Sequence, residues 1–364
     1  MQYYLTVFPG LERIAAEVLK DRFEIEALEP IEGRNNVLVP FETNVPVEEL
    51  LTIGIAEDLF IALGVYDFRG SRQEIETIPQ ALHDLKDLDL ALTYHRKTLP
   101  VAKRKTTFRV VAQAIHDPKE YRRVDFQMAL EEAIDKRYNK RWERVEDEAG
   151  LEIWAHLLID KVVLGLRLSD ERMRHREYKL EHLPASLRPT LAYALVWLSK
   201  IEATDTFVDP MCGAGTILIE RAQAGRYAQI YGGDLRDEAV SAALTNIGNK
   251  YKPITVQAWD ARDLPFDSQT IDKIVCNLPF GKQIGSPEEN QELYGSFLGE
   301  TSRVLKAGGR AVFLTSEGVL FKKRLRPHRE LKLVREERNI KVLGCLATIF
   351  ILEKKWIEKL CHSL

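Results

Sequence analysis

The spacing of hydrophobic residues changes character near residue 183 of the chain. Before it, stretches with a two-residue period are mixed irregularly with stretches of helical period. After it, short apolar stretches alternate regularly with amphipathic ones, which is typical of an open, mainly parallel sheet with helices on both faces. We therefore predict an α/β fold, with an α+β N-terminal half and a doubly wound C-terminal domain.

The N-terminal half carries signals for several strands and helices. Residues 2–8 alternate as a strand does, Pro9 and Gly10 interrupt the pattern, and apolar residues then recur at helical spacing. Asp160 and Lys161 fall between two apolar runs, which predicts a β-hairpin. We also expect strands over 37–41 and 108–115, and helices over 45–63 and 126–134.

The C-terminal half opens with a strongly amphipathic stretch over 184–201, which predicts a helix. The last two strands are linked through Gly344, and so short a link permits only an antiparallel hairpin. We expect strands over 206–210, 229–234, 255–260, 273–279, 310–316, 332–340 and 346–356, with helices from Thr216, from Asp237 and over 291–305.

The composition is that of a folded protein, with 45% hydrophobic and 29% charged residues. The four cysteines lie far apart, without the close pairs of a zinc site or the density of a disulfide framework. No apolar run approaches the roughly 18 residues of a membrane-spanning helix. We expect a cytoplasmic monomer with reduced thiols, no metal and no membrane contact.

Charge is unevenly distributed along the chain. The net charge is -3, yet residues 96–144 hold fourteen lysines and arginines against seven acidic residues, and residues 322–335 hold seven against one. Segregated basic stretches attract phosphates even in a mildly acidic protein. The composition is therefore compatible with a nucleic acid partner.

A glycine turn follows the first strand of the C-terminal half. TFVDPMCGAGT places Asp209 at the strand end and two glycines before a helix, where the backbone can approach a ligand closely. Asp234 and Asp260 end the next two strands, which suits ribose hydroxyls and an adenine amine. A lone glycine turn more often simply starts a helix, but three ordered carboxylates favour a nucleotide-like cofactor. The GxGxxG spacing of dehydrogenases is missing.

DPMCGAGT resembles the first motif of class I S-adenosylmethionine-dependent methyltransferases, whose catalytic domain is Rossmann-like. The resemblance implies S-adenosylmethionine as cofactor, with Asp209 near its amine, Asp234 at the ribose and Asp260 at the adenine. The implied cofactor contacts are Thr190, Asp209, Pro210, Cys212, Gly213, Ala214, Gly215, Thr216, Asp234, Leu235, Asp260, Ala261 and Asn277.

Asn277, Leu278, Pro279 and Phe280 resemble the (D/N)PP(Y/F) motif of methyltransferases that act on exocyclic amines. The lone pair of such an amine is delocalised into the ring, so acceptors must hold and polarise it. The Asn277 side-chain oxygen and the Leu278 carbonyl can accept its two hydrogens, while Pro279 stiffens the loop and Phe280 stacks on the base. Alone, a strand-ending turn with a core aromatic explains the tetrapeptide about as well. After three cofactor elements in order, the catalytic interpretation is favoured.

Basic and aromatic residues are interleaved between positions 103 and 142. A solvated helix face explains part of this stretch, but the KRK and RR groups suit phosphate contacts better. The region resembles a THUMP RNA-binding domain, and the chain start resembles the ferredoxin-like domain that accompanies it. We predict RNA contacts from Lys103, Arg104, Lys105, Arg122, Arg123 and Lys282.

The two halves together resemble the THUMP-containing tRNA guanine-N2 methyltransferases. The resemblance implies a ferredoxin-like domain over 1–55, a THUMP domain over 56–168, a linker over 169–185 and a methyltransferase domain over 186–356. It also implies tRNA as the partner and an acceptor-stem guanosine N2 amine as the target. Two alternatives stay open: the same chemistry on guanine N2 of ribosomal RNA or adenine N6 of DNA or RNA, and a noncatalytic RNA-binding protein with a methylase fold.

Overall fold

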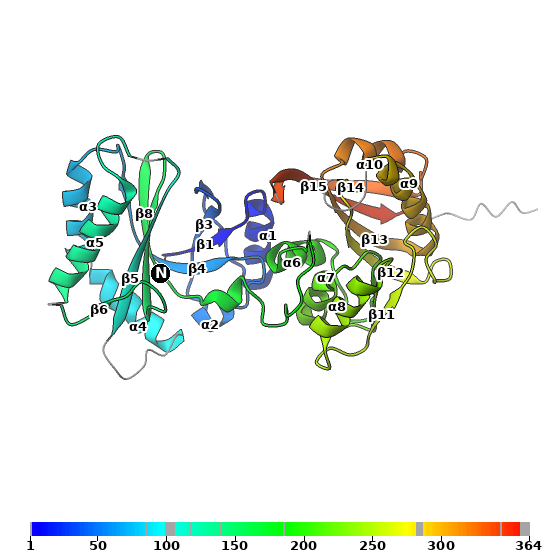
Figure 1. The fold of residues 1–364 in the computed structure, drawn as a ribbon, viewed down its shortest axis with the longest axis horizontal. Helices are drawn as coiled ribbons and strands as arrows, with labels where there is room; N and C mark the ends of the chain where they lie inside the picture. Colours follow the sequence, from blue (N-terminus) through cyan, green and yellow to red (C-terminus); the bar gives the residue numbers. More distant parts are fainter. Residues whose placement is uncertain are drawn as a thin grey trace, which may run out of the picture. The chain divides into compact units, whose positions relative to one another are not determined.

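The computed structural model describes residues 2–84, 86–98, 106–116, 118–138, 140–184, 186–281, 287–342 and 344–356. The chain divides into two compact units, Met1–Arg174 and His175–Leu364. In the described residues, each unit contains one β-sheet together with helices (Figure 1). The predicted α/β class with an α+β N-terminal half is confirmed.

The N-terminal unit has one sheet in its described part. Its strands are β1 (Gln2–Val7), β2 (Ile31–Glu32), β3 (Val37–Glu42), β4 (Asp58–Asp67), β5 (Thr107–Ala114), β6 (Glu143–Arg144), β7 (Leu151–Leu157) and β8 (Lys161–Arg167), and their order in the sheet is β2-β3-β1-β4-β8-β7-β5-β6. The helices are α1 (Glu12–Phe23), α2 (Val47–Leu50), α3 (Gln73–Asp84), α4 (Lys86–Thr98) and α5 (Arg123–Arg137), followed by a 3-10 turn over Glu171–Met173. Helices α3 and α5 pack against each other (Figure 1).

The predicted hairpin between β7 and β8 is confirmed, because these strands pair antiparallel and the Leu158 N–H donates to the Lys161 carbonyl at 2.8 Å. The helix expected over 45–63 is wrong. Only Val47–Leu50 is helical, residues 51–57 form turns, and the run continues into strand β4 from Asp58. Strand β4 lies inside the sheet between β1 and β8, and its first four residues, 58–61, are all buried, so both faces of the sheet are covered there. Such a continuous apolar run cannot be told from a buried helix by period alone.

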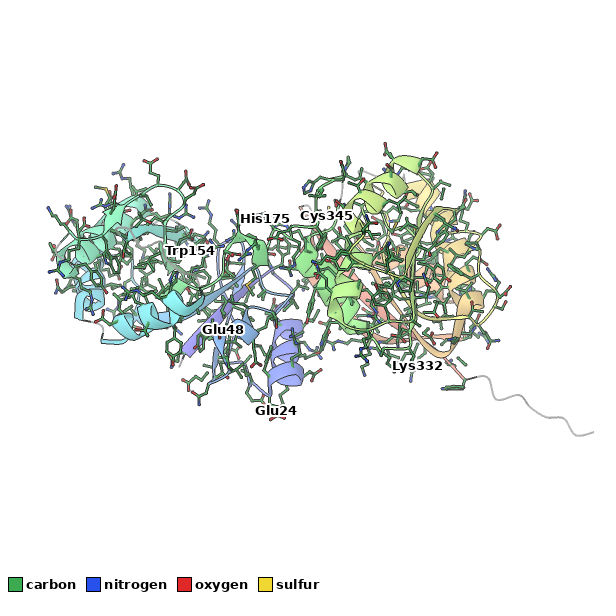
Figure 2. All side chains as sticks on the ribbon, turned by 90° about the horizontal axis from the view of Figure 1, so that it is seen from below. Glu24, Glu48, Trp154, His175, Lys332 and Cys345 are labelled. Carbon is green, nitrogen blue, oxygen red and sulfur yellow. The ribbon has the colours of Figure 1, made fainter. Side chains whose placement is uncertain are left out.

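The C-terminal unit contains a doubly wound sheet. Its elements are α6 (Pro189–Leu198), β9 (Thr206–Asp209), α7 (Thr216–Ala224), β10 (Gln229–Asp234), α8 (Asp237–Ile247), β11 (Ile254–Ala258), β12 (Ile271–Asn277), α9 (Pro287–Val304), β13 (Leu305–Thr315), α10 (Gly318–Leu325), β14 (Leu331–Val342) and β15 (Cys345–Lys354). The sheet order is β11-β10-β9-β12-β13-β15-β14. Strands β9 to β13 pair in parallel and β14 and β15 antiparallel, as predicted. Cys345 begins the last strand (Figure 2).

An aromatic cluster holds α9 and α10 against this sheet. Phe321 of α10 stacks on Phe350 of β15 with ring centroids 4.5 Å apart, and it contacts Phe313 of β13 edge to face. Phe297 of α9 meets Phe313 in the same way. All four rings are buried, so the cluster fixes α9 in place. No helix among the described residues is long and apolar enough to cross a membrane.

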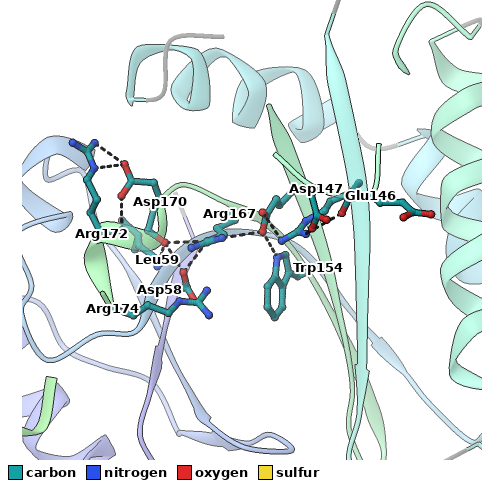
Figure 3. Close-up of polar contacts among 12 residues, drawn as sticks. Asp58, Leu59, Glu146, Asp147, Trp154, Arg167, Asp170, Arg172 and Arg174 are labelled. Atoms are coloured by element: carbon teal, nitrogen blue, oxygen red, sulfur yellow. Dashed lines mark hydrogen bonds and ion pairs between the residues drawn. The ribbon is translucent and has the colours of Figure 1, made fainter. Parts of the chain in front are cut away.

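A buried network of charged residues connects the sheet of the N-terminal unit to the end of that unit (Figure 3). The Asp58 carboxylate, on β4, accepts hydrogen bonds from Arg167 Nε at 2.7 Å, from Ser169 Oγ at 2.9 Å and from Arg174 Nη2 at 2.6 Å. Arg167 Nη1 also reaches Glu152 Oε2 of β7 at 3.0 Å. The network therefore links three adjacent strands of the sheet, β4, β8 and β7, to the last residues of the unit.

We expect Asp58→Ala to destabilise the protein by about 3–5 kcal/mol, because it removes one of the two carboxylates that pair with the buried guanidinium of Arg167 and the carboxylate that binds Arg174. Urea denaturation followed by circular dichroism measures the loss. Asp67→Ala is the matched control, since Asp67 lies on the same strand but is exposed, and it should shift stability by less than about 0.5 kcal/mol. Equal shifts for the two variants would contradict a stabilising role of the network.

Candidate active site

A pocket of about 430 Å³ lies where strands β9, β10, β11 and β12 end. Its wall combines residues that the sequence patterns single out with residues that they miss. Those singled out are Asp209, Pro210, Cys212, Gly213, Ala214, Thr216, Asp234, Leu235, Asp260, Ala261, Asn277, Leu278, Pro279 and Phe280. Thr190 and Gly215 do not line the pocket; Thr190 is buried in the first turn of α6.

The glycine turn is tied to the neighbouring strand by its own backbone. The Cys212 N–H donates to the Gly233 carbonyl at 2.8 Å, and the Gly213 N–H donates to Asp234 Oδ2 at 3.0 Å. Gly213 has φ +49°, and a β-carbon there would meet nothing within 4 Å, so open space lies in front of the turn. At Gly215, with φ +78°, a β-carbon would come 3.2 Å from Ala243 Cβ. Gly215 thus permits close packing of α7 on α8.

Asp209 ends β9 and is buried. Its Oδ1 accepts a hydrogen bond from the Met211 N–H at 3.3 Å. Burial raises the pKa of Asp209 from 3.8 to about 8, because it penalises the charged form. The carboxyl group is therefore mostly protonated at neutral pH.

Asp260 has the opposite environment, since it is half-buried and accepts hydrogen bonds from Arg262 Nε at 3.0 Å and Nη2 at 2.7 Å. These bonds lower the pKa of Asp260, which remains an anion. The neighbouring Trp259 is a pocket residue that lies outside the sequence motifs. Its indole N–H donates to the Pro210 carbonyl at 3.0 Å, and its ring lies where a β-carbon on Gly233 would be. The indole therefore braces the ends of three strands.

The tetrapeptide after β12 is held from two sides. The Leu278 N–H, which a proline would lack, donates to the Leu314 carbonyl of β13 at 3.0 Å. The Pro279 carbonyl accepts from Asn290 Nδ2 at 3.0 Å and from the Tyr294 hydroxyl at 2.7 Å. The loop is thus fixed although Leu278 replaces a proline of the motif. Among the described residues, the buried Asn277 Oδ1 has no hydrogen-bond partner.

The segment before α6 forms another part of the wall that the sequence patterns did not indicate. Leu183, Pro184, Ser186 and Leu187 line the pocket, and all but Leu183 lie within the stretch predicted to be helical. The helix begins only at Pro189, because proline suits the first helical position and disfavours helix in the residue before it. Arg188, directly before it, has an extended backbone, and the Ser186 N–H donates to the Leu183 carbonyl in a turn. Pro189 is therefore the sequence signal from which the later start of the helix could have been predicted.

Asn246 of α8 attaches this segment to the glycine turn. Its Oδ1 accepts from the backbone N–H groups of Leu180 and Glu181, both at 2.8 Å, and its Nδ2 donates to the Ala214 carbonyl at 2.9 Å. One buried amide thus joins the polar segment 175–184 to the pocket wall. The segment packs as part of the C-terminal unit.

The predicted RNA contacts lie in different settings. Arg122 is exposed and pairs with Asp125 at 3.0 Å, and Arg123 Nη1 donates to the Ala112 carbonyl at 2.6 Å. Lys103, Arg104, Lys105 and Lys282 lie outside the described residues. Within the described ranges, no group of three or more His, Cys, Asp or Glu side chains is arranged to hold a metal ion.

Comparisons with known proteins agree with this geometry. Residues 176–347 match the family model described as an RMKL-like methyltransferase domain. The tRNA (guanine(6)-N(2))-methyltransferase THUMP3 of Mus musculus is 34% identical over 199 residues, which are 51% of this chain and 39% of that protein. The tRNA (guanine(6)-N2)-methyltransferase of Methanocaldococcus jannaschii is 26% identical over 97% of this chain and 100% of its own length. The crystal structure of TrmN from Thermus thermophilus superposes with a TM-score of 0.77 at 23% identity, over 97% of this chain and 99% of that one.

The C-terminal unit is therefore a class I methyltransferase domain. Within it, residues 176–347 match the RMKL-like methyltransferase domain, and its cofactor is S-adenosylmethionine. The chain spans about two fifths of the mouse relative's length.

The pocket fits this cofactor. Leu235 is 69% exposed although apolar, and it lines the pocket, where a flat adenine ring would cover it. Gly213 leaves open space, and Asp234 and Asp260 present carboxylate oxygens at neighbouring strand ends. When bound, S-adenosylmethionine supplies an electrophilic methyl group.

We expect the buried carboxyl of Asp209 to make stability fall as pH rises. Its folded pKa of about 8 exceeds the ordinary 3.8, so between these values the folded state retains a proton that the unfolded state has released. The free energy of unfolding should decrease by up to about 1.4 kcal/mol per pH unit in that window. Urea denaturation between pH 5 and pH 7.5 (roughly the centre of the window) measures the slope.

Asp209→Asn is the control for this slope, because the amide keeps an acceptor for the Met211 N–H and does not titrate. The variant should show a shallower dependence than the wild type. Parallel slopes would mean that Asp209 titrates normally.

Proposed function

We propose that this protein transfers the methyl group of S-adenosylmethionine to the exocyclic N2 amine of a guanosine in tRNA, in the acceptor stem. The observation that carries the proposal is the buried, unpartnered Oδ1 of Asn277 in the wall of the pocket. A buried acceptor without a donor is costly, and a substrate amine supplies the missing hydrogens. The named activities of the mouse and M. jannaschii relatives support guanine and tRNA as the targets.

The residues of the tetrapeptide have different roles in binding the target base and its amine. Asn277 Oδ1 and the Leu278 carbonyl accept its two hydrogens, which increases electron density on nitrogen and aims its lone pair. Phe280 lines the same pocket and stacks on the extruded base. The hydrogen bonds to the Pro279 carbonyl keep these groups in place, so little reorganisation is needed when the reaction occurs.

Three carboxyl groups hold the cofactor in this proposal. Asp234 binds the ribose hydroxyls and Asp260 the adenine amine, both as hydrogen-bond acceptors. Asp209 lies near the methionyl amine, and a cation beside it would favour the carboxylate form. The nitrogen of the methylated amine loses its extra proton to water.

We also propose that the N-terminal unit binds RNA, with a ferredoxin-like domain over 1–55 and a THUMP domain over 56–168. Strand β4 pairs with strands from both parts, so the two would share one sheet. Phosphate and shape recognition suits such a module because the major groove of an RNA helix is too deep to read. The linker is proposed over 169–185, before the methyltransferase domain over 186–356.

The test incubates the protein with methyl-labelled S-adenosylmethionine and unmodified tRNA, then identifies the labelled nucleoside and its position. Label should appear in N2-methylguanosine, and Asn277→Ala should lower the rate at least about 100-fold while cofactor affinity stays the same. Label in adenosine, or only with ribosomal RNA, would overturn the assigned substrate. Cofactor binding without label in any RNA would favour a noncatalytic protein.

The basic stretch before β5 can be tested separately. Replacing Lys103, Arg104 and Lys105 by alanine should weaken tRNA binding, because phosphate contacts are lost, and cofactor affinity should not change. The slope of log affinity against log salt should fall by roughly 0.7–0.9 for each contact removed. An unchanged slope would exclude this stretch from the interface.

A further inference from the structure

Asn290 is a second pocket residue with a buried amide oxygen that lacks a donor. Its side chain lies in the first turns of α9 and is 1% exposed. Among the described residues, both Asn290 Oδ1 and Asn277 Oδ1 lack a hydrogen-bond partner. Both residues line the same pocket. The pocket wall thus carries two unpaired amide acceptors.

The orientation of the Asn290 amide follows from its other atom. Nδ2 donates to the Pro279 carbonyl at 3.0 Å, and a carbonyl cannot donate in return, so the oxygen is the end left unpaired. Tyr294, four residues further along the same face of α9, donates its hydroxyl to the same carbonyl at 2.7 Å. The Pro279 carbonyl therefore has two donors, and holding the loop does not by itself require Asn290.

The chemistry of the bases indicates what two acceptors select. Guanine presents an N1–H donor directly beside its N2 amine. Adenine presents an unprotonated N1 acceptor beside its amine, and cytosine presents an unprotonated N3 acceptor. An amide oxygen beside the amine site can accept a hydrogen bond from guanine N1–H. With adenine or cytosine the same oxygen would face the lone pair of a ring nitrogen, so it would be unpaired and repelled.

We propose that Asn290 determines specificity for guanine by accepting a hydrogen bond from N1–H while Asn277 holds the N2 amine. This inference rests on the proposed function and deepens it. The side-chain amide of Asn290 then acts at two places, with its nitrogen on the catalytic loop and its oxygen on the base. Sites built around such a hydrogen bond reject analogues that lack the donor by about 10⁴-fold.

The experiment compares two tRNAs that differ only at the mapped target, which is guanosine in one and 2-aminopurine in the other. 2-Aminopurine keeps the N2 amine but has no N1 hydrogen. The measured quantity is the ratio of kcat/KM for the two RNAs, in the wild type and in three variants. Asn290→Leu removes the amide but keeps a side chain of similar size. Asn290→Asp keeps an oxygen acceptor. Tyr294→Phe removes only the other donor to the Pro279 carbonyl.

We expect the wild type to prefer guanosine strongly and Asn290→Leu to reduce that ratio at least about 100-fold. Asn290→Asp and Tyr294→Phe should slow both RNAs and leave the ratio close to that of the wild type. Comparing ratios between variants cancels the effect of the missing 6-oxo group of 2-aminopurine. Cofactor affinity, measured for every variant, reports whether the domain is folded.

Three results are distinguishable from the expected one. A wild-type ratio near one overturns the proposal without any variant. If Asn290→Leu slows methylation of both RNAs, as Tyr294→Phe does, but leaves the ratio of kcat/KM unchanged, Asn290 only positions the loop and the proposal is wrong. A wild type that places no label in N2-methylguanosine overturns the proposed function itself.

Discussion

The parallel pairing of β9 with β10 on one side and β12 on the other is the constraint on which the site depends. Gly232 lies opposite Asp209, and Ile274 lies opposite Val208, so the three strands end at one edge of the sheet. Residues far apart in sequence, Asp209, Asp234 and Asn277, are brought to one pocket by this register. Main-chain hydrogen bonds set the register, which makes the geometry of the pocket insensitive to most surface changes.

Around that edge the protein places similar groups in different environments. Asp209 is buried with a raised pKa, whereas Asp260 is half-buried and kept ionised by Arg262. The pocket can therefore offer a neutral and a charged carboxyl group within one site, suited to different parts of a ligand. The amide oxygens of Asn277 and Asn290 add acceptors that carry no net charge, which suits an amine whose own charge changes during methyl transfer.

Other parts of the pocket wall come from helix α9 and from the segment before α6. Helix α9 is held against the sheet by aromatic packing, and through Asn290 and Tyr294 it grips the loop after β12. The segment before α6 is attached through Asn246 to the glycine turn. A substitution that breaks either attachment would therefore alter the pocket, because each attachment contacts the pocket wall directly.

Local sequence patterns were enough to predict the alternation of strands and helices in the C-terminal unit, the closing antiparallel hairpin, and the strand-end motifs around Asp209, Asp234 and Asn277. These follow from local period, turn residues and the rule that ligands bind at the carboxyl ends of parallel strands. Only the folded structure shows that Asp58–Asp67 form the central strand β4, because burial of its first residues on both faces removes the alternation that marks a strand. Tertiary packing also brings Trp259 and Asn290 to the pocket and Asn246 to the back of its glycine turn. Their roles depend on contacts with the carbonyls of Pro210, Ala214 and Pro279, and no spacing along the chain encodes a hydrogen bond between a side chain and a distant backbone.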